Sequence, residues 1–393
     1  MSYKIFPKKL SEIFCSIKFR FFLATILIVP VFLFISFVNT YKNKGVEDKF
    51  KNIANIYSDY DSSKLTHRLV KSDEANGIVT INEARIAYGA INDFLSKVKD
   101  VCKPDDTTEN FLRCANEVLG DNFYYKEANT VAHAYANHYS DCDLNVYLLF
   151  DAAKIFNKKI EIVYAPRHAF VSFISEKYGA RFYWETTDNE NKGALAELTR
   201  PFYSKSINHF YYSPMDERSI EKVYSILSIA DVDKGKMDVL LNSIDKSMMD
   251  NPFYLDFYYS SKKDKKKLEQ KDAYTLYGLI QDDVSSMDKR LILSKYLLEH
   301  EQKNSAVNII NQIDDGVCDL QCMKVKKEIS AIDEVYYYIM KAFKWCNADV
   351  PLAIVKEFFL TLLYLYLLVG TFFFGIIVQK EYNKNQHANV NKK

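Results

Sequence analysis

Glycine is scarce in this chain, and an excess of either charge is absent. The 393 residues include only 11 glycines, and 52 basic against 51 acidic side chains leave a formal net charge of +1. A chain without a positive excess lacks the electrostatic footprint of a nucleic-acid-binding protein, and no bulk acidic partner is indicated. The 29 tyrosines and 27 phenylalanines beside so few glycines predict a mostly helical chain with a well-filled core. The length allows two or three domains.

Metal-ligand and repeat signatures are also lacking. No histidine stands near a cysteine pair with the spacing of a zinc site. The aspartates at 282 and 283 do not have the spacing of a calcium loop. The short helical segments beyond Arg200 resemble helix pairs of a degenerate tetratricopeptide array, but no 34-residue signature recurs. We therefore expect no metal and no other cofactor.

Two long uncharged segments lie near the ends of the chain. Residues 21–38 form a run of 18 uncharged residues, and residues 358–378 form a run of 21. As helices, such runs span about 27–32 Å, close to the thickness of the hydrocarbon core of a bilayer. A cleaved signal peptide is the alternative for the first run, but no small-x-small cleavage site follows it. The pattern predicts two transmembrane helices.

The charges beside these two runs predict an orientation. Residues 1–20 carry five basic side chains against one acid, and residues 379–393 are also basic. By the positive-inside rule both termini lie in the cytoplasm and residues from about 40 to 355 lie on the far side. The expected localisation is the bacterial cytoplasmic (inner) membrane, with the main domain periplasmic.

The seven cysteines can be interpreted against that topology. In an oxidising compartment, cysteines close in sequence are natural disulfide partners. Two local disulfides are expected: Cys102 with Cys114, and Cys318 with Cys322. Cys142 is then free for chemistry. The alternative pairs Cys142 with Cys346, which would exclude a thiol enzyme.

Cys142 lies at the predicted start of an apolar helix. Asp141 is a favourable N-cap residue, and apolar residues continue to Phe156 on nearly every side of the helix. Such a helix is enclosed by other elements. The unpaired N–H groups of its first turn favour a thiolate at Cys142, whereas the negative charges of Asp141 and Asp143 oppose it.

Three strands are predicted after this helix, and they bring a histidine close to a glutamate. The predicted strands cover residues 160–164, 168–174 and 181–186. We place the hairpin turn of the last two between Glu176 and Lys177. In that register His168 lies directly opposite Glu185, on the same face, with Cβ atoms about 4.5–5.5 Å apart.

The segment from 141 to 187 resembles the transglutaminase-like superfamily, in its compact bacterial branch of papain-like cysteine proteases. The residues that carry the resemblance are Asp-Cys-Asp at 141–143, Pro-Arg-His-Ala-Phe at 166–170 and Trp-Glu-Thr-Thr at 184–187. The resemblance implies that Cys142 is the nucleophile, His168 the general base and Glu185 the third member of the site. It extends more loosely from Asn82 to Arg200.

The segment departs from the family pattern at three points. Glu185 stands where aspartate is commoner, and Ser140 stands where glycine is frequent. No upstream glutamine or tryptophan is a clear oxyanion-hole residue, so the N–H of Cys142 is one candidate donor. The nearest upstream side chains remain open as candidates: Asn137, His138 and Tyr139.

The predicted fold class is an α+β transglutaminase-like (papain-like) domain followed by an all-α helical-hairpin domain and flanked by two transmembrane helices. The predicted boundaries are a cytoplasmic N-terminus at 1–20, a membrane helix at 21–38, the transglutaminase-like domain at 45–200, the helical domain at 215–348, a membrane helix at 358–378 and a cytoplasmic tail at 379–393.

The predicted function is that of a membrane-anchored cysteine protease or amidase acting by thiol acyl transfer on a protein or peptide in the periplasm or envelope. Water as acceptor would give hydrolysis and an amine would give cross-linking. The alternative is a catalytically inactive domain in a membrane-tethered binding or assembly protein. The helical domain would then be a platform for a protein partner, or only a spacer.

Overall fold

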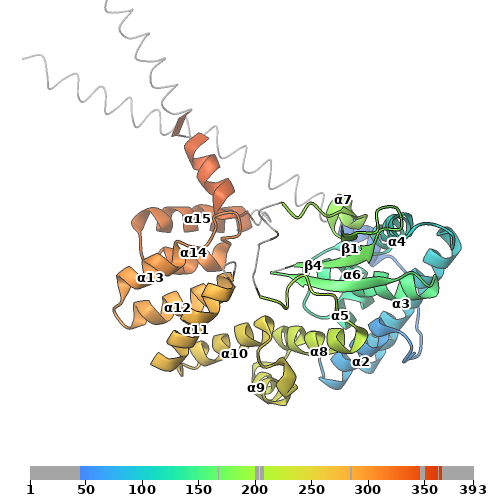
Figure 1. Cartoon of the computed structure of the whole chain (residues 1–393), viewed down its shortest axis with the longest axis horizontal. Coiled ribbons are helices and arrows are strands. Elements are labelled where there is room, and N and C mark those ends of the chain that lie inside the picture. The colour runs from blue at the N-terminus through green and yellow to red at the C-terminus, as the bar shows by residue number, and fades with distance from the viewer. Residues whose placement is uncertain are drawn as a thin grey trace, which may run out of the picture. The chain divides into compact units, whose positions relative to one another are not determined.

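The computed structural model divides the chain into two compact units, one formed by residues 44–313 and one formed by the two ends of the chain, 1–43 and 314–393 (Figure 1). The residues that the structure describes are 45–166, 168–199, 203, 208–283, 286–345, 350–361 and 363–364.

In the unit of residues 44–313, helices precede and follow a small sheet. After a helical segment at 45–51, the helices are α2 (Leu65–Ala75), α3 (Ile81–Val101), α4 (Thr108–Asn122), α5 (Val131–Ala136) and α6 (Cys142–Ile155). The strands are β1 (Tyr124–Tyr125), β2 (Tyr139–Ser140), β3 (Ile160–Ala165), β4 (His168–Ile174), β5 (Arg181–Glu185) and β6 (Ala194–Leu195). The later helices are α7 (Asp188–Asn191), α8 (Glu217–Leu227), η1 (Ser228–Asp231), α9 (Lys234–Ser243), η2 (Lys246–Met248), α10 (Pro252–Asp264), α11 (Gln270–Asp282), α12 (Met287–Glu299) and α13 (Lys303–Ile310).

Helix α6 lies at the centre of this unit. It packs against α2, α3 and α4 and also against β3 and β4, so the sequence prediction of an enclosed helix is confirmed (Figure 1). Its side chains Val146, Tyr147 and Leu148 are fully buried. Because nearly every side of α6 is covered, the tip that carries Cys142 has a fixed position against the sheet.

The four-stranded sheet has the order β3-β4-β5-β6, with antiparallel neighbours. Successive residues of β4 point to opposite faces. Ala169, Val171 and Phe173 belong to the large core that includes α6, whereas Phe170 packs on the other face against Tyr203. The start of β4 therefore lies between a helix-covered face and a smaller aromatic cluster.

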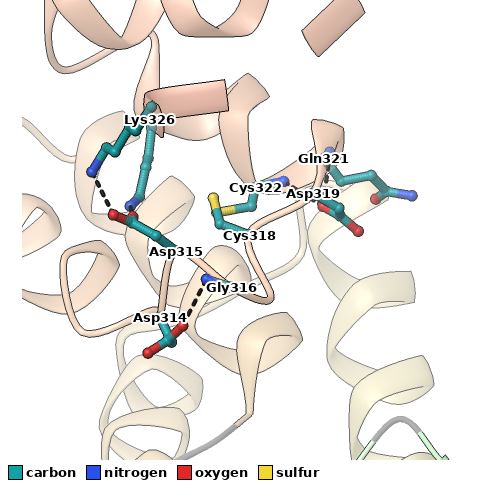
Figure 2. The surroundings of a disulfide bond; sticks show 9 residues. Asp314, Asp315, Gly316, Cys318, Asp319, Gln321, Cys322 and Lys326 are labelled. Carbon is teal, nitrogen blue, oxygen red and sulfur yellow. Dashed lines mark hydrogen bonds and ion pairs between the residues drawn. A yellow bond between two sulfur atoms is a disulfide. The ribbon is translucent and has the colours of Figure 1, made fainter. Parts of the chain in front are cut away.

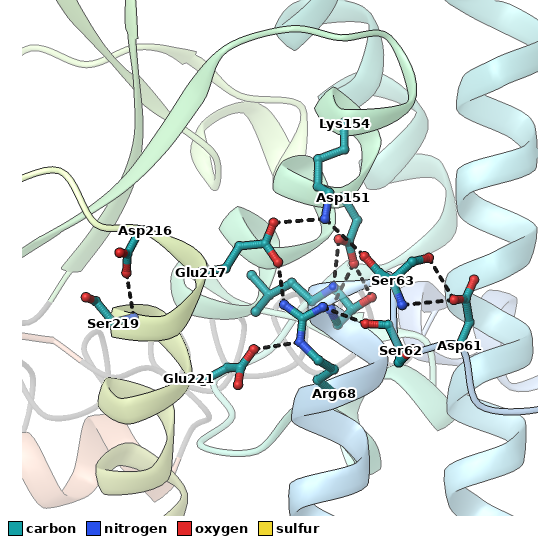
Figure 3. A network of polar contacts seen from close by, with 12 residues as sticks. Asp61, Ser62, Ser63, Arg68, Asp151, Lys154, Asp216, Glu217, Ser219 and Glu221 are labelled. Atoms are coloured by element: carbon teal, nitrogen blue, oxygen red, sulfur yellow. Dashed lines mark hydrogen bonds and ion pairs between the residues drawn. The ribbon is translucent and has the colours of Figure 1, made fainter. Parts of the chain in front are cut away.

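Helix α8 enters the same core as the sheet. Its residue Tyr224 is buried and donates its hydroxyl to the carboxylate of Asp73 on α2, at 2.7 Å. Arg68 on α2 forms ion pairs with Glu217 and Glu221 of α8, the latter at 2.6 Å (Figure 3). Apolar burial and charge pairing thus join α8 to the helices that precede the sheet.

The N-terminus of α2 is capped by a residue that is remote in sequence. Lys64, the N-cap residue, makes no capping hydrogen bond with its side chain. The carboxylate of Asp151 on α6 instead accepts hydrogen bonds from the backbone N–H groups of Leu65 and Thr66, at 2.9 and 2.8 Å (Figure 3). It also accepts a hydrogen bond from the hydroxyl of Thr66, at 2.6 Å. These bonds satisfy donors that a helix cannot satisfy internally.

The other unit contains α14 (Leu320–Lys326), α15 (Ala331–Trp345) and a helical segment at 352–361. Asp319 caps α14 by accepting from the N–H groups of Gln321 and Cys322, both at 2.9 Å (Figure 2). The carboxylate of Asp315 lies between Lys326 and Lys356, which ties α14 to the helical segment.

Both predicted disulfides are confirmed. Cys318 and Cys322 are bonded, with Cα atoms 5.3 Å apart (Figure 2). Cys102 and Cys114 are bonded as well, with Cα atoms 5.8 Å apart, and link the end of α3 to α4. Cys346 lies outside the described residues.

The predicted fold class is wrong. In place of an α+β papain-like domain beside a separate helical domain and two membrane helices, the described chain is predominantly helical with a few short strands. The physical reason is that the sheet is a small layer covered by helices on one face, and α8 buries its apolar face in the same core. The sequence prediction gave most weight to a short segment whose strands are a minor part of the fold.

The predicted membrane topology is also corrected. Among the helices that the structure describes, none is both long and apolar enough to reach across a lipid bilayer. We therefore do not retain the two-span inner-membrane protein, or the periplasmic location that depended on it. The first predicted span, 21–38, lies outside the described residues, and the second, 358–378, is described only as far as 364. At its start, Phe358 packs against Phe343 of α15, a contact that hydropathy does not reveal.

Candidate functional site

The tip of α6 holds Cys142 in a fixed place. Asp141 is the N-cap residue, as predicted, and one of its carboxylate oxygens accepts from the N–H of Leu144 at 3.3 Å. The other oxygen accepts from the N–H of Ala128 at 2.8 Å. Asp141 therefore links the helix tip to the loop before α5 while Cys142 occupies the first helical position.

The thiol of Cys142 lies beside the start of β4. Its sulfur accepts a hydrogen bond from the backbone N–H of Ala169, the residue after His168. The sulfur also lies 3.6 Å from Oδ1 of Asp143. Cys142 is a free thiol, which contradicts the alternative disulfide with Cys346. The first turn of α6 and the start of β4 are therefore in contact, as the order of these segments in the sequence predicts.

The surroundings of Cys142 disfavour a resting thiolate. Burial raises the pKa of the Cys142 thiol well above its usual value, and the charges of Asp143 and Asp141 raise it further. The N–H of Ala169 acts in the opposite direction. Burial beside Asp143 also raises the pKa of Asp141 to about 7. A thiol in this environment stays protonated near neutral pH unless a base removes its proton.

His168 and Glu185 form a close, buried pair. Nε2 of His168 lies 2.5 Å from Oε2 of Glu185, and the exposed fractions of the two side chains are 5% and 2%. The structure therefore brings together the two residues that the predicted hairpin placed side by side. Glu185 ends β5 and His168 begins β4, so the pair lies at one end of the sheet.

The hairpin register differs from the predicted one by two residues. Val171 pairs with Trp184 and Ile174 with Arg181, so the turn lies further along the chain than expected. Continuing this register places Glu185 opposite Phe170 and diagonal to His168. Side chains alternate with a period of two, so a two-residue shift keeps Glu185 on the predicted face. Diagonal neighbours are about 7–8 Å apart, a distance that suits the longer side chain of glutamate.

Glu185 is held by groups that the sequence did not indicate. The N–H and the hydroxyl of Thr187 donate to Oε1, at 2.9 and 2.8 Å, and the hydroxyl of Tyr203 donates to Oε2 at 2.5 Å. Burial alone would raise the pKa of Glu185, but the hydrogen bond and charge of His168 and the donors Tyr203 and Thr187 lower it to about 2. Glu185 is therefore a carboxylate throughout the neutral range. Tyr203 also packs its ring against His168, with centroids 5.3 Å apart.

A buried polar chain connects the helix tip to the end of β5. The members are Ser140, Asn145, Asn191, Asn116 and Trp184. Ser140 donates to Asn145 at 2.5 Å, and Asn145 donates to the side chain of Asn191 at 3.1 Å. Asn116 donates to the carbonyl groups of Asn191 and Thr186 and accepts from the indole of Trp184. We refer to these five residues as the amide chain. It gives Ser140 a structural role at a position where the family often has glycine.

The upstream candidates for an oxyanion-hole side chain make other contacts. Asn137 donates to the carbonyl of His133 at 2.8 Å, and a ring nitrogen of His138 lies 3.2 Å from the carbonyl of Asn122. The ring of Tyr139 lies under the ammonium group of Lys126. The N–H of Cys142 remains the candidate donor from the sequence. Within the described ranges, no group of three histidine, cysteine or acidic residues is arranged to hold a metal ion.

Comparisons with known proteins return a likeness to a solved structure. No protein-family model matches the chain, and no curated protein matches it. Among solved structures, the chain is similar to menin, in a crystal structure described as revealing the binding site for Mixed Lineage Leukemia (MLL) protein. The identity is 8%, the TM-score is 0.44, and the likeness covers 73% of this chain and 71% of the menin chain. A likeness at this level carries no argument about function.

Proposed function

We propose that this protein catalyses thiol acyl transfer from an amide, with Cys142 as nucleophile, His168 as general base and Glu185 as the residue that orients the base. The observation that carries the proposal is the buried His168–Glu185 pair together with a free thiol at Cys142, which accepts from the backbone N–H of Ala169, the residue after His168. A nucleophile, a base and an orienting acid in this order are the recurring parts of covalent acyl transfer. The resemblance of residues 141–187 to the transglutaminase-like superfamily supports the same roles.

We propose separate tasks for the two ring nitrogens of His168. Nε2 is the nitrogen beside Glu185, so Nδ1 is the one that takes the proton from the thiol. The sulfur then forms a bond to the carbonyl carbon, and the negative oxygen is stabilised at the N–H of Cys142. The protonated imidazole gives its proton to the leaving amine as the amide bond breaks. Water or an amine then attacks the thioester and loses a proton to the imidazole. The C–S bond breaks, the acyl group leaves on the water or amine, and the imidazole returns the proton to the sulfur.

The raised pKa of Cys142 determines how the base acts. A thiol that stays protonated in the resting site must lose its proton as the attack occurs. His168 is therefore a general base in the attack step, and the site does not depend on a thiolate formed in advance. The substrate class is a protein or peptide amide, with water and amine as the two acceptors.

A second candidate is a binding domain that keeps the arrangement without catalysis. The observation that favours it is the pair of acidic neighbours, Asp141 and Asp143, which raise the pKa of the Cys142 thiol. In such a protein His168 and Glu185 would be a structural pair at the end of the sheet. The thiol would then have no base-dependent reactivity.

Alkylation of Cys142 by iodoacetamide separates the two candidates. In the enzyme, His168→Ala is expected to slow alkylation of Cys142 at neutral pH by about tenfold or more, because no base then takes the thiol proton as the sulfur attacks. The rate is followed by mass spectrometry of the peptide that contains Cys142. His133→Ala, which removes an exposed histidine paired with Glu83, is the matched control and should leave the rate unchanged. Equal rates in wild type and His168→Ala would favour the binding domain.

Glu185→Gln tests the role of the third residue. A glutamine can donate its amide N–H to Nε2, which would place the imidazole proton on Nδ1 and leave no acceptor for the thiol proton. We expect the rate of acyl transfer to fall by roughly 10²–10⁴-fold. Tyr203→Phe removes one neutral donor to Glu185 and should cost only about tenfold. The initial rate of 4-nitrophenyl acetate cleavage measures both. Losses of equal size would show that the charge of Glu185 is not the important property.

A further inference from the structure

Three consecutive helices of the unit of residues 44–313 line an open cavity of about 1150 Å³. On α11 the lining side chains follow a helical spacing from Gln270 through Tyr274 to Tyr277, and on α12 the spacing from Leu293 to His300 is the same. Residues spaced by three and four positions share one face of a helix. Each helix therefore contributes one continuous stripe to the cavity.

The stripe from α13 consists mainly of carboxamide and hydroxyl groups. Its polar members are Gln302, Ser305, Asn308 and Gln312, all of them exposed. Gln302 is the N-cap residue of α13 but makes no capping hydrogen bond with its side chain. A carboxamide offers one acceptor and two donors, which match the C=O and N–H of a peptide group.

The opposite stripe, from α11, is aromatic. Tyr274 and Tyr277 are 71% and 54% exposed, so both rings extend from the helix into the space beside it. Between the two stripes, α12 supplies a floor that includes Leu293 and Tyr296. His300 stacks on Tyr296 with ring centroids 4.0 Å apart and makes a 2.8 Å hydrogen bond to its carbonyl, which fixes the end of the floor.

None of the side chains that line the cavity is an aspartate, glutamate, lysine or arginine. A charged ligand would find no opposite charge among these side chains and would gain no ion pair there. The cavity therefore selects an uncharged ligand. The polar stripe also disfavours a helical peptide, whose own backbone groups are already paired.

We propose that this cavity binds an uncharged, extended segment of a partner protein. The main chain of the segment lies along the carboxamide stripe, and its apolar or proline side chains lie on Tyr274 and Tyr277. The 8 residues of α13 rise by about 12 Å, the length of about four residues in extended polyproline conformation. Aromatic faces suit such segments because proline keeps them extended before binding.

Affinity selection from two peptide pools tests the proposal on the whole protein. One pool of capped peptides is randomised over proline, alanine, leucine, serine, asparagine and glutamine. In the other pool, aspartate and lysine replace asparagine and glutamine. Wild type should retain peptides from the uncharged pool, and retention should fall about tenfold or more in a double variant with Asn308→Ala and Gln312→Ala. Tyr277→Ala should give a similar loss.

Matched controls remove the same groups outside the cavity. Asn304→Ala removes an exposed amide of α13 that does not line the cavity, and Tyr178→Ala removes an exposed tyrosine of the β4–β5 turn. Both should retain peptides as wild type does. The proposal fails if no peptide is retained, if the charged pool is preferred, if the cavity variants bind like wild type, or if soluble oligosaccharides are retained in place of peptides. Unchanged circular dichroism would show that a loss of binding is not a loss of fold.

Discussion

Cys142→Ala is expected to abolish acyl transfer. If the sulfur forms the covalent intermediate, no other group in the site can replace it, and the rate should fall by about 10³-fold or more. His168→Ala should lose roughly 10²–10⁴-fold, because the raised pKa of the thiol leaves little thiolate without a base. The measurement is the initial rate of 4-nitrophenyl acetate cleavage, with mass spectrometry to locate the acetyl group.

The acetylated peptide distinguishes a true intermediate from background reaction. Wild type should carry one acetyl group on the peptide that contains Cys142, and this adduct should disappear when hydroxylamine is added. His133→Ala should behave as wild type, since its side chain pairs with Glu83 and takes no part in the site. An adduct on lysines alone, with the same rate in Cys142→Ala, would contradict the proposed function.

Of all the substitutions proposed, Asp151→Ala is expected to lower the free energy of unfolding most. Asp151 is 3% exposed and accepts three hydrogen bonds from Leu65 and Thr66, both of which are fully buried. Alanine would leave two buried N–H groups and one hydroxyl without an acceptor. We expect the free energy of unfolding to fall by about 3–5 kcal/mol. Urea denaturation followed by circular dichroism measures the change.

Two further variants define the cause of that loss. Asp151→Asn keeps one carbonyl oxygen as an acceptor and should cost about 1–2 kcal/mol. Asp264→Ala removes an aspartate whose side chain is 71% exposed, and its effect should stay within about 0.5 kcal/mol. If Asp151→Ala and Asp264→Ala had equal effects, the remote cap of α2 would not matter to stability.

Local patterns predicted the elements around Cys142. The N-cap at Asp141, the enclosed helix α6 and the three strands after it follow from capping chemistry, from an all-round apolar helix and from β-branched and aromatic runs. The pairing of His168 with Glu185 was predicted although the predicted register differed by two residues from the observed one. A change of register by two residues leaves each side chain on the same face of the sheet, whereas a change by one would move it to the other face. The free thiol and the two local disulfides were also predictable.

Contacts between distant parts of the sequence could not be predicted in this way. Tyr203 and Asn116 lie on segments far from Glu185 and Trp184, and nothing in their local sequence indicates these partners. The packing of α8 into the core of the sheet is likewise set by side chains such as Tyr224 that meet only in the folded chain. The fold class was wrong for this reason, since local patterns do not show which helices share a core.

The amide chain has a consequence for how the proposed enzyme would work. It joins the helix tip, through Ser140 and Asn145, to the strand end, through Asn116 and Trp184, by buried hydrogen bonds. To move the helix tip away from the end of β5, these bonds would have to break without access to solvent. In the proposed enzyme, Cys142 at the helix tip and Glu185 beside Trp184 would therefore keep their relative positions. Rate enhancement would come from alignment that exists before the substrate arrives, with no closing motion needed to create it.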